Sequence, residues 1–260
     1  MPGMSKIFTT EIASSELPSD NPIHQRLLKP YVMASQWLSG DLLEVGCGEG
    51  RGIEWVQSSI RSYSAIDKIR QAVEVLQKKY PEHQFVSANL PPLPYEDASF
   101  DSVISFQVIE HIRNDRLFLK EIYRVLRPGG VLLLTTPNRL QSLSRNPWHV
   151  REYTGPELAA LTRQFFPNVE MKGITGNEKV MTYHEQNRAS VNRLMKWDIL
   201  DLQHRLPAFL LRIPYDMLNR VNRNKLKHSS DQLVESISHN DFILVDDPKQ
   251  ALDLFMIARK

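Results

Sequence analysis

Three glycines at alternate positions, Gly46, Gly48 and Gly50, follow the apolar run that begins at Leu42. An apolar strand that enters a glycine-rich turn and then a helix constrains the fold strongly. Glycine lets the backbone approach a ligand, and the helix N-terminus offers free N–H groups. Asp67 ends the next apolar run, where a carboxylate can accept hydrogen bonds from both ribose hydroxyls of a nucleoside. The turn and the carboxylate together indicate a nucleoside cofactor.

Strand-like and helix-like segments alternate from this turn to about residue 174. The short apolar runs have the length and composition of strands buried on both faces, and amphipathic segments separate them. This alternation is typical of βαβ units and predicts a parallel sheet. The predicted strands are 41–46, 63–67, 84–88, 102–106 and 130–136, and the predicted helices are 51–59, 71–80 and 115–126.

The composition excludes several classes of protein. Lys and Arg number 32 and Asp and Glu number 30, so the net charge of +2 cannot attract nucleic acid or a membrane to the whole surface. The single cysteine, Cys47, excludes an internal disulfide and a cysteine-clustered zinc site. The first 20 residues lack the apolar core of a signal peptide, and no apolar run reaches the ~18 residues of a membrane span. We therefore expect a cytoplasmic location.

The spacing of the glycines differs from the dinucleotide fingerprint G-x-G-x-x-G, whose third glycine would stand at Arg51. With Glu44 two residues before the turn, segment 44–50 resembles the first motif of class I S-adenosylmethionine-dependent methyltransferases, particularly those similar to methyltransferase type 11. The resemblance extends to 100–104, 108–112 and 126–130 in the family's order, and covers residues 24–174 and, more weakly, the last strand.

The resemblance implies a three-layer α/β fold with a seven-stranded, mostly parallel Rossmann-like sheet, whose last strand, near 251–258, is antiparallel. Its site should lie at the carboxyl ends of the first, second and fourth strands. We expect four parts: an N-terminal segment and lid at 1–40, the methyltransferase core at 41–174, a helical insertion that forms a substrate lid at 175–240, and the terminal strand that completes the sheet at 241–260.

The family's cofactor is S-adenosylmethionine, which becomes S-adenosylhomocysteine, and the resemblance implies which residues hold it. Glu44 would orient the amino group of the methionine part, and Asp67 would hold the ribose. Gly46, Cys47 and Gly48 would lie against the methionine part. We interpret Cys47 as small packing, not as a nucleophile, because no partner histidine or aspartate is near it in the sequence.

Two further positions concern the adenine and the methyl-transfer chamber. Asn89, which precedes Leu90, stands where relatives often carry an aspartate that accepts a bond from the adenine amine. Its carbonyl can still accept, but without the charge the bond should be weaker by roughly 1 kcal/mol. Phe106 and Gln107 would border the chamber in which methyl transfer takes place.

Transfer to a hydroxyl requires alignment, exclusion of water and a group that takes one proton. His111, just after the fourth strand, is the first candidate base, with the alternative that it only packs or caps its turn. Because no clustered Asp, Glu and His pattern suggests a dedicated ion, we predict a metal-independent reaction. Other candidate bases lie outside the motifs: His149, Tyr153, Tyr183 and His184.

The insertion contains a basic, amphipathic stretch at 205–228, with six Lys or Arg residues against Asp216 alone. Such a stretch can make weak contact with an anionic membrane or grip a phosphate-bearing substrate. A lid helix packed on the core with a solvated basic face is the more common arrangement. Pro207 and Pro214 interrupt the helical pattern and count against an interfacial helix.

The sequence thus predicts an S-adenosylmethionine-dependent methyltransferase that acts in line on an acceptor, an oxygen on a small molecule, a lipid-linked intermediate or a glycan. Nucleic acid is not expected, because an Asp/Asn-Pro-Pro-aromatic turn does not follow the fourth strand. One alternative is a non-catalytic nucleoside-binding module that docks a partner or membrane. Another is an NAD-dependent oxidoreductase, which the missing fingerprint glycine disfavours. The oligomeric state stays open, because no self-association signature is present.

Overall fold

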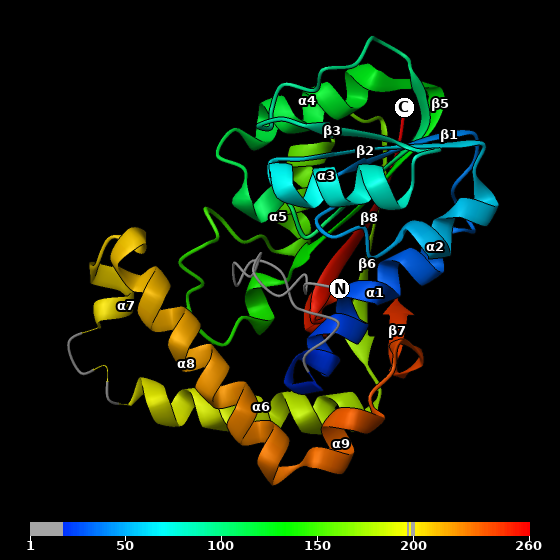
Figure 1. Cartoon of the computed structure of the whole chain (residues 1–260). Helices are drawn as coiled ribbons and strands as arrows, with labels where there is room; N and C mark the ends of the chain where they lie inside the picture. Colours follow the sequence, from blue (N-terminus) through cyan, green and yellow to red (C-terminus); the bar gives the residue numbers. More distant parts are fainter. Residues whose placement is uncertain (1–17, 197, 199–200) are drawn as a thin grey trace.

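The computed structural model describes residues 18–196, 198 and 201–260 (Figure 1). An eight-stranded sheet has the strand order β3-β2-β1-β4-β5-β8-β6-β7. The pairs from β3 to β5 are parallel, whereas β8 is antiparallel to β5 and β6, and β7 is antiparallel to β6. The strands are β1 (Asp41–Val45), β2 (Ser62–Asp67), β3 (Gln84–Ser87), β4 (Phe100–Phe106), β5 (Leu126–Pro137), β6 (Asn168–Gly176), β7 (Phe242–Val245) and β8 (Asp253–Arg259).

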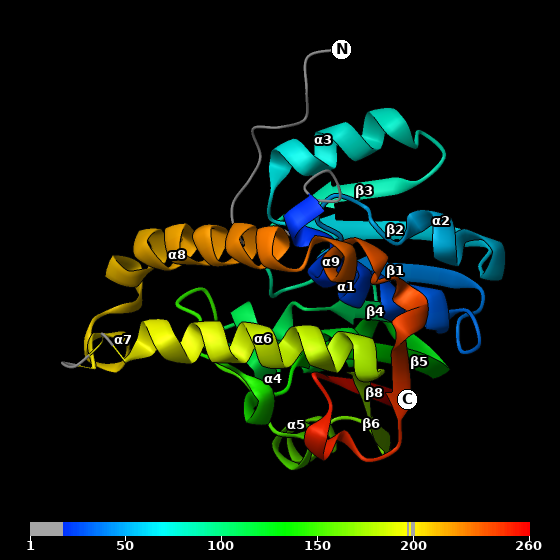
Figure 2. The ribbon, with the colours of Figure 1, turned by 90° about the horizontal axis from the view of Figure 1, so that it is seen from below.

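Helices cover both faces of the sheet and give three layers (Figures 1 and 2). Successive residues of a strand point to opposite faces, so Leu42 belongs to one hydrophobic cluster and Leu43 to the other. α1, α2 and α3 pack into the first cluster, and α4 and α5 into the second. The helices are α1 (Asn21–Ala34), α2 (Ile53–Val56), α3 (Arg70–Lys79), α4 (Asp115–Val125), α5 (Gly155–Thr162), α6 (Glu178–Met195), α7 (Leu202–Arg205), α8 (Ala208–Ser229) and α9 (Asp231–Ser236).

The structure confirms the predicted fold class, with one strand more than the seven expected. The additional strand is β7, which pairs only with β6 at the edge of the sheet. Of its four residues only Phe242 is buried, so β7 lacks the continuous burial of the central strands. The predicted division at residues 40, 174 and 240 stays a prediction.

The segment between β6 and β7 is helical and lies beside the sheet. In Figure 2, α6 and α8 run side by side and extend past the edge of the sheet. The prediction that the prolines interrupt the helix was wrong at one position: Pro207 precedes α8, but Pro214 lies inside it. A proline inside a helix loses one N–H bond at a cost of ~3 kcal/mol, yet α8 continues through it and is held by contacts to α6 and Asp20. Among the described residues, no helix is both long and apolar enough to cross a membrane.

Candidate functional site

The glycine turn after β1 is tied to the end of β2. Gly46 has φ +85° and Gly48 has φ +52°, the left-handed region that glycine adopts without strain. A Cβ atom at Gly46 would lie 2.3 Å from Cγ2 of Val108, so a larger residue does not fit there. The backbone N–H of Gly46 donates to the carbonyl of Ile66 at 2.7 Å, and that of Gly48 donates to Oδ2 of Asp67 at 2.8 Å.

Asp67 is fixed by the backbone and keeps capacity for a ligand. Its Oδ1 accepts from the N–H of Ile69 at 2.9 Å, and its Oδ2 accepts from Gly48. The residue is only 8% exposed. Because each carboxylate oxygen has two lone pairs, both oxygens can still accept from the hydroxyls of a ribose.

A cavity of about 240 Å³ lies over the carboxyl ends of β1, β2 and β4, where the sequence predicted the site. It also draws on side chains that the sequence did not single out, among them Leu27 of α1 and Ile112. The structure brings these predicted residues together in its wall: Gly46, Cys47, Gly48, Asp67, Asn89, Leu90, Phe106, Gln107 and His111. The roles assigned to them stay predictions.

Glu44 is not among the residues that line this cavity. It is fully buried, and its two oxygens accept hydrogen bonds from the hydroxyls of Tyr31, at 2.6 Å, and Tyr63. Burial raises the pKa of Glu44 to about 7, although the two hydroxyls favour the charged form. Contact between Glu44 and the amino group of the cofactor stays a prediction.

Cys47 and Phe106 form apolar parts of the same wall. Burial raises the pKa of the Cys47 thiol well above its usual value, and the negative charges of Glu44 and Asp67 raise it further. The thiol is therefore protonated and unsuited to nucleophilic attack. Phe106 meets the ring of Tyr31 edge to face at 4.8 Å, so α1 covers the cavity above β4.

Gln107 separates this cavity from a second one of about 300 Å³, and it lines both together with Leu27. Gln107 has φ +59°, and its amide nitrogen donates to Oδ1 of Asp253 at 3.2 Å and Oγ1 of Thr135 at 3.3 Å. The second cavity lies between α1, the loop after β5, α6 and α8. Many of its side chains are polar: Arg26, Asn138, Gln141, Ser142, Ser144, Asn146, His149, Glu152, His184, Asn187, Asn219, Asn222 and Arg223.

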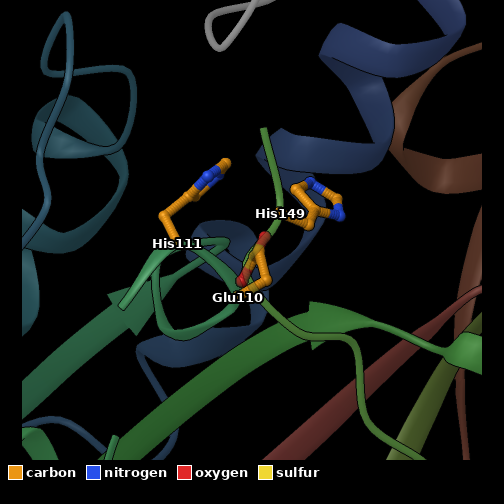
Figure 3. A group of neighbouring side chains, drawn as sticks. All are labelled: Glu110, His111 and His149. Carbon is orange, nitrogen blue, oxygen red and sulfur yellow. The ribbon is translucent and has the colours of Figure 1, made fainter. Parts of the chain in front are cut away.

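His111 and His149 lie close together after β4 and β5 (Figure 3), with their rings 5.0 Å apart. Nδ1 of His111 is 3.0 Å from the carbonyl oxygen of Trp148. A carbonyl only accepts, so this contact places the hydrogen of a neutral ring on Nδ1 and a lone pair on Nε2. In His149, Nδ1 lies 2.6 Å from Glu152 and Nε2 lies 2.8 Å from the amide of Asn146.

Glu110 completes a group of three whose ligand-type atoms lie within 4.8 Å of one another, with His111 and His149. The sequence predicted no metal site and gave no sign of this group. Hydrogen bonds already engage both nitrogens of His149, and Oε2 of Glu110 accepts from Thr136 at 2.9 Å. Burial raises the pKa of Glu110 to about 7, and His149 opposes this rise. The predicted metal independence of the reaction stays a prediction.

The remaining candidate bases lie in different places. Tyr183 and His184 line the second cavity, and burial next to Arg26 lowers the pKa of His184 to about 4. Tyr153 lines neither cavity, and its hydroxyl donates to Oδ2 of Asp115 at 2.8 Å. Arg26, from the N-terminal segment, is paired with Asp253 through a 2.6 Å contact between Nε and Oδ2.

Fold, turn and cavity define a Rossmann-like protein with a site suited to a nucleoside cofactor. Similarity to known proteins shows which family within this class the chain belongs to. The methyltransferase-domain family matches residues 43–134. A probable S-adenosylmethionine-dependent methyltransferase of Mycolicibacterium smegmatis is 33% identical over 186 residues, 70% of this chain and 67% of that protein. One of Mycobacterium tuberculosis is 39% identical over 144 residues, 54% of this chain and 50% of that protein, so the match spans half of that relative.

Among solved structures, an S-adenosylmethionine-dependent methyltransferase of Thermotoga maritima has a TM-score of 0.58 and 16% identity, over 92% of this chain and 91% of that one. At this identity the likeness shows the fold alone. From its relatives, the chain belongs to the S-adenosylmethionine-dependent methyltransferases, and S-adenosylmethionine is its cofactor. The residues present fit that cofactor, because Asp67 keeps acceptor capacity at the cavity wall and the turn at Gly48 leaves open space.

Proposed function

We propose that this protein transfers a methyl group from S-adenosylmethionine to an oxygen of a hydroxylated acceptor in the cytoplasm. The observation that carries the proposal is the pair of adjoining cavities, one with Asp67 and the glycine turn, the other polar, which share Gln107 and Leu27 as a common wall. The cofactor supplies a methyl group activated by its sulfonium. The protein then needs to hold the acceptor at the wall formed by Gln107 and exclude water.

The cofactor contacts follow from the first cavity. In this proposal Asp67 accepts from the ribose hydroxyls, and the turn at Gly46 and Gly48 lies against the methionine part. Leu90 packs on the adenine, and the carbonyl of Asn89 accepts from its amine. Glu44 does not line the cavity, so it acts on the cofactor indirectly: it accepts the hydrogen bond of the Tyr31 hydroxyl, and Tyr31 lines the cavity.

The second cavity suits a polar acceptor. Its amides, histidines and hydroxyls can donate and accept bonds to several hydroxyl groups at once, which favours a polyhydroxylated small molecule, a glycan or the polar part of a lipid-linked intermediate. α6 and α8 supply one side of this cavity, so we propose that the insertion at 175–240 is the lid over the acceptor. Nucleic acid is not proposed, because Phe106 and Gln107 stand where an amino-methylating enzyme would carry an Asn-Pro-Pro turn.

His111 is the proposed base. It lines the first cavity close to Gln107, and the bond to the Trp148 carbonyl leaves Nε2 with the lone pair that a proton acceptor needs. The acceptor hydroxyl would give its proton to Nε2 as the new carbon–oxygen bond forms and the sulfur–methyl bond of the sulfonium breaks, which leaves S-adenosylhomocysteine. This step needs no metal ion, so turnover should persist in the presence of a chelator.

Calorimetry with S-adenosylmethionine, S-adenosylhomocysteine and NADH tests the cofactor assignment. Wild type should bind the first two and give no NADH signal. Asp67→Ala should weaken the affinity for S-adenosylmethionine and for S-adenosylhomocysteine by about 10–100-fold, because it removes charge-assisted bonds to the ribose. Asp246→Ala, at a carboxylate that is 92% exposed, is the control and should bind like wild type.

A screen of hydroxylated acceptors for formation of S-adenosylhomocysteine then tests methyl transfer. Unchanged affinity in folded Asp67→Ala, or tight binding of NADH, would contradict the assignment. Binding of the cofactor without turnover on any acceptor would favour the non-catalytic docking module.

A further inference from the structure

The outward face of α8 is apolar. Phe209, Ile213, Met217 and Val221 recur every four residues, so they form one stripe along the helix. Their exposed fractions are 67%, 72%, 65% and 65%. At 1.5 Å per residue the stripe is about 18 Å long. Single exposed apolar side chains are ordinary, but a continuous stripe of this kind marks an interaction surface.

The inward face of the same helix is polar where it meets the second cavity, and farther along that face Leu226 is buried in the hydrophobic core. Asn219 and Arg223 line the second cavity, and Asn222 is 5% exposed. The amide nitrogen of Asn222 donates to Oδ1 of Asn187 on α6 at 2.7 Å, and its oxygen accepts from Ser190. A lid helix that packs on a core usually turns its apolar side inward. In α8 a stripe of large apolar side chains lies on the outer face instead, so this stripe has a use other than packing on this chain.

The charges around the stripe indicate what covers it. Segment 205–228 carries six Lys or Arg residues and one acid, Asp216, which accepts from the indole N–H of Trp148 at 3.0 Å. Arg220 and Arg223 pair with buried Asp20. Arg212, whose guanidinium lies 4.2 Å over the ring of Trp148, and Lys225 are exposed on α8, and Arg205 is exposed at the end of α7. Exposed apolar side chains with cations beside them complement a bilayer surface, where acyl chains lie beneath anionic headgroups.

We propose that the outward face of α8 docks the protein on an anionic lipid surface. A second copy of this chain fits less well, because a symmetric interface would bring the same cation-rich segment against itself. The apolar stripe would enter the headgroup boundary while Arg205, Arg212 and Lys225 contact lipid phosphates. Docking would place the polar inner face of α8, and with it the second cavity, next to the membrane.

Sedimentation of the full chain with vesicles tests this. Wild type should bind phosphatidylcholine vesicles that contain about 30% phosphatidylglycerol, more weakly at high salt, and bind poorly to phosphatidylcholine alone. Ile213→Asp with Met217→Asp should reduce binding at least about tenfold, because both side chains leave the acyl region and add negative charge. A second variant, Arg205→Gln with Lys225→Gln, should weaken binding to the anionic vesicles only.

Leu140→Asp is the matched control, since Leu140 is 54% exposed on a turn that is not part of α8, and this variant should keep wild-type binding. Thermal melting of each variant shows whether it is folded, independently of any cofactor. No vesicle binding by wild type overturns the proposal, and so does equal binding by wild type and the Ile213/Met217 variant. Self-association that the same variant abolishes, without vesicle binding, would assign the face to a second copy instead.

Discussion

Glu44 is a fully buried carboxyl, and its proton should make stability depend on pH. Its pKa is raised from 4.5 to about 7, so the folded protein keeps a proton that the unfolded chain releases above about pH 4.5. The resulting stabilisation is complete below pH 4.5 and is lost as pH rises through 7. At 1.36 kcal/mol per unit, the loss is about 3 kcal/mol.

Glu44→Gln should remove this loss. We expect the free energy of unfolding of the variant, relative to wild type, to rise by about 3 kcal/mol between pH 4.5 and 7.5 in urea titrations. The difference between the proteins is the quantity to compare, because His24 and His184, with pKa values of about 4, contribute with the opposite sign in both. Glu82→Gln, at an exposed carboxyl, should give no such change. Parallel curves for Glu44→Gln and wild type would contradict the prediction.

His111 and His149 offer a matched pair for the proposed base. His111→Gln should lower turnover by about 10²–10⁴-fold, because general-base catalysis contributes on this scale. His149→Gln should lower it far less, since hydrogen bonds to Glu152 and Asn146 occupy both ring nitrogens. The rate of S-adenosylhomocysteine formation measures both, with calorimetry as the check that the cofactor still binds. Unaltered turnover in His111→Gln would mean that His111 only packs its turn.

At the scale of elements, the turn between β1 and α2 allows a test of why its glycines are needed. Gly46→Ala combines a positive φ with a Cβ 2.3 Å from Val108, whereas Gly48→Ala meets nothing within 4 Å and adds only the strain of its φ. Backbone strain of this kind costs about 1–3 kcal/mol. We therefore expect Gly46→Ala to lower the free energy of unfolding clearly more than Gly48→Ala in urea titrations. Equal losses would show that Val108 moves aside without cost.

The strands differ in how well the sequence predicted them. Central strands were predictable because burial on both faces demands continuous apolar residues, as in β5 around Leu133. The edge strand β7 was not, because pairing on one side leaves Ile243 45% exposed. The sequence did not reveal Tyr63 as a partner of Glu44, because their contact depends on the register of β1 and β2. Leu42 pairs with Tyr63, and Leu42 and Glu44 point to the same face of the sheet, so Tyr63 points to that face too.

At the scale of the whole molecule, Asp20 connects the N-terminal helix to the helix above the second cavity. It is fully buried just before α1, and the guanidinium groups of Arg220 and Arg223 on α8 lie 3.0 and 3.2 Å from its Oδ1. These contacts hold α8 against the rest of the chain across 200 residues of sequence. The sequence motifs do not extend to this contact, which only the fold brings together.

Asp20→Ala should therefore loosen α8 and leave two arginines facing each other. Removing one partner of a fully buried ion pair costs about 3–5 kcal/mol. Arg220 and Arg223 are 37% and 20% exposed, so we expect a smaller loss and a lower melting temperature. Cofactor affinity should stay near wild type in calorimetry, because Asp20 does not line the first cavity, while the KM for the acceptor should rise. Asp97→Ala is the control. Asp97 is 79% exposed and pairs with Arg124, so its removal should lower the free energy of unfolding by less than about 1 kcal/mol. If both variants melt alike, α8 is held by its contacts with α6 and not by Asp20.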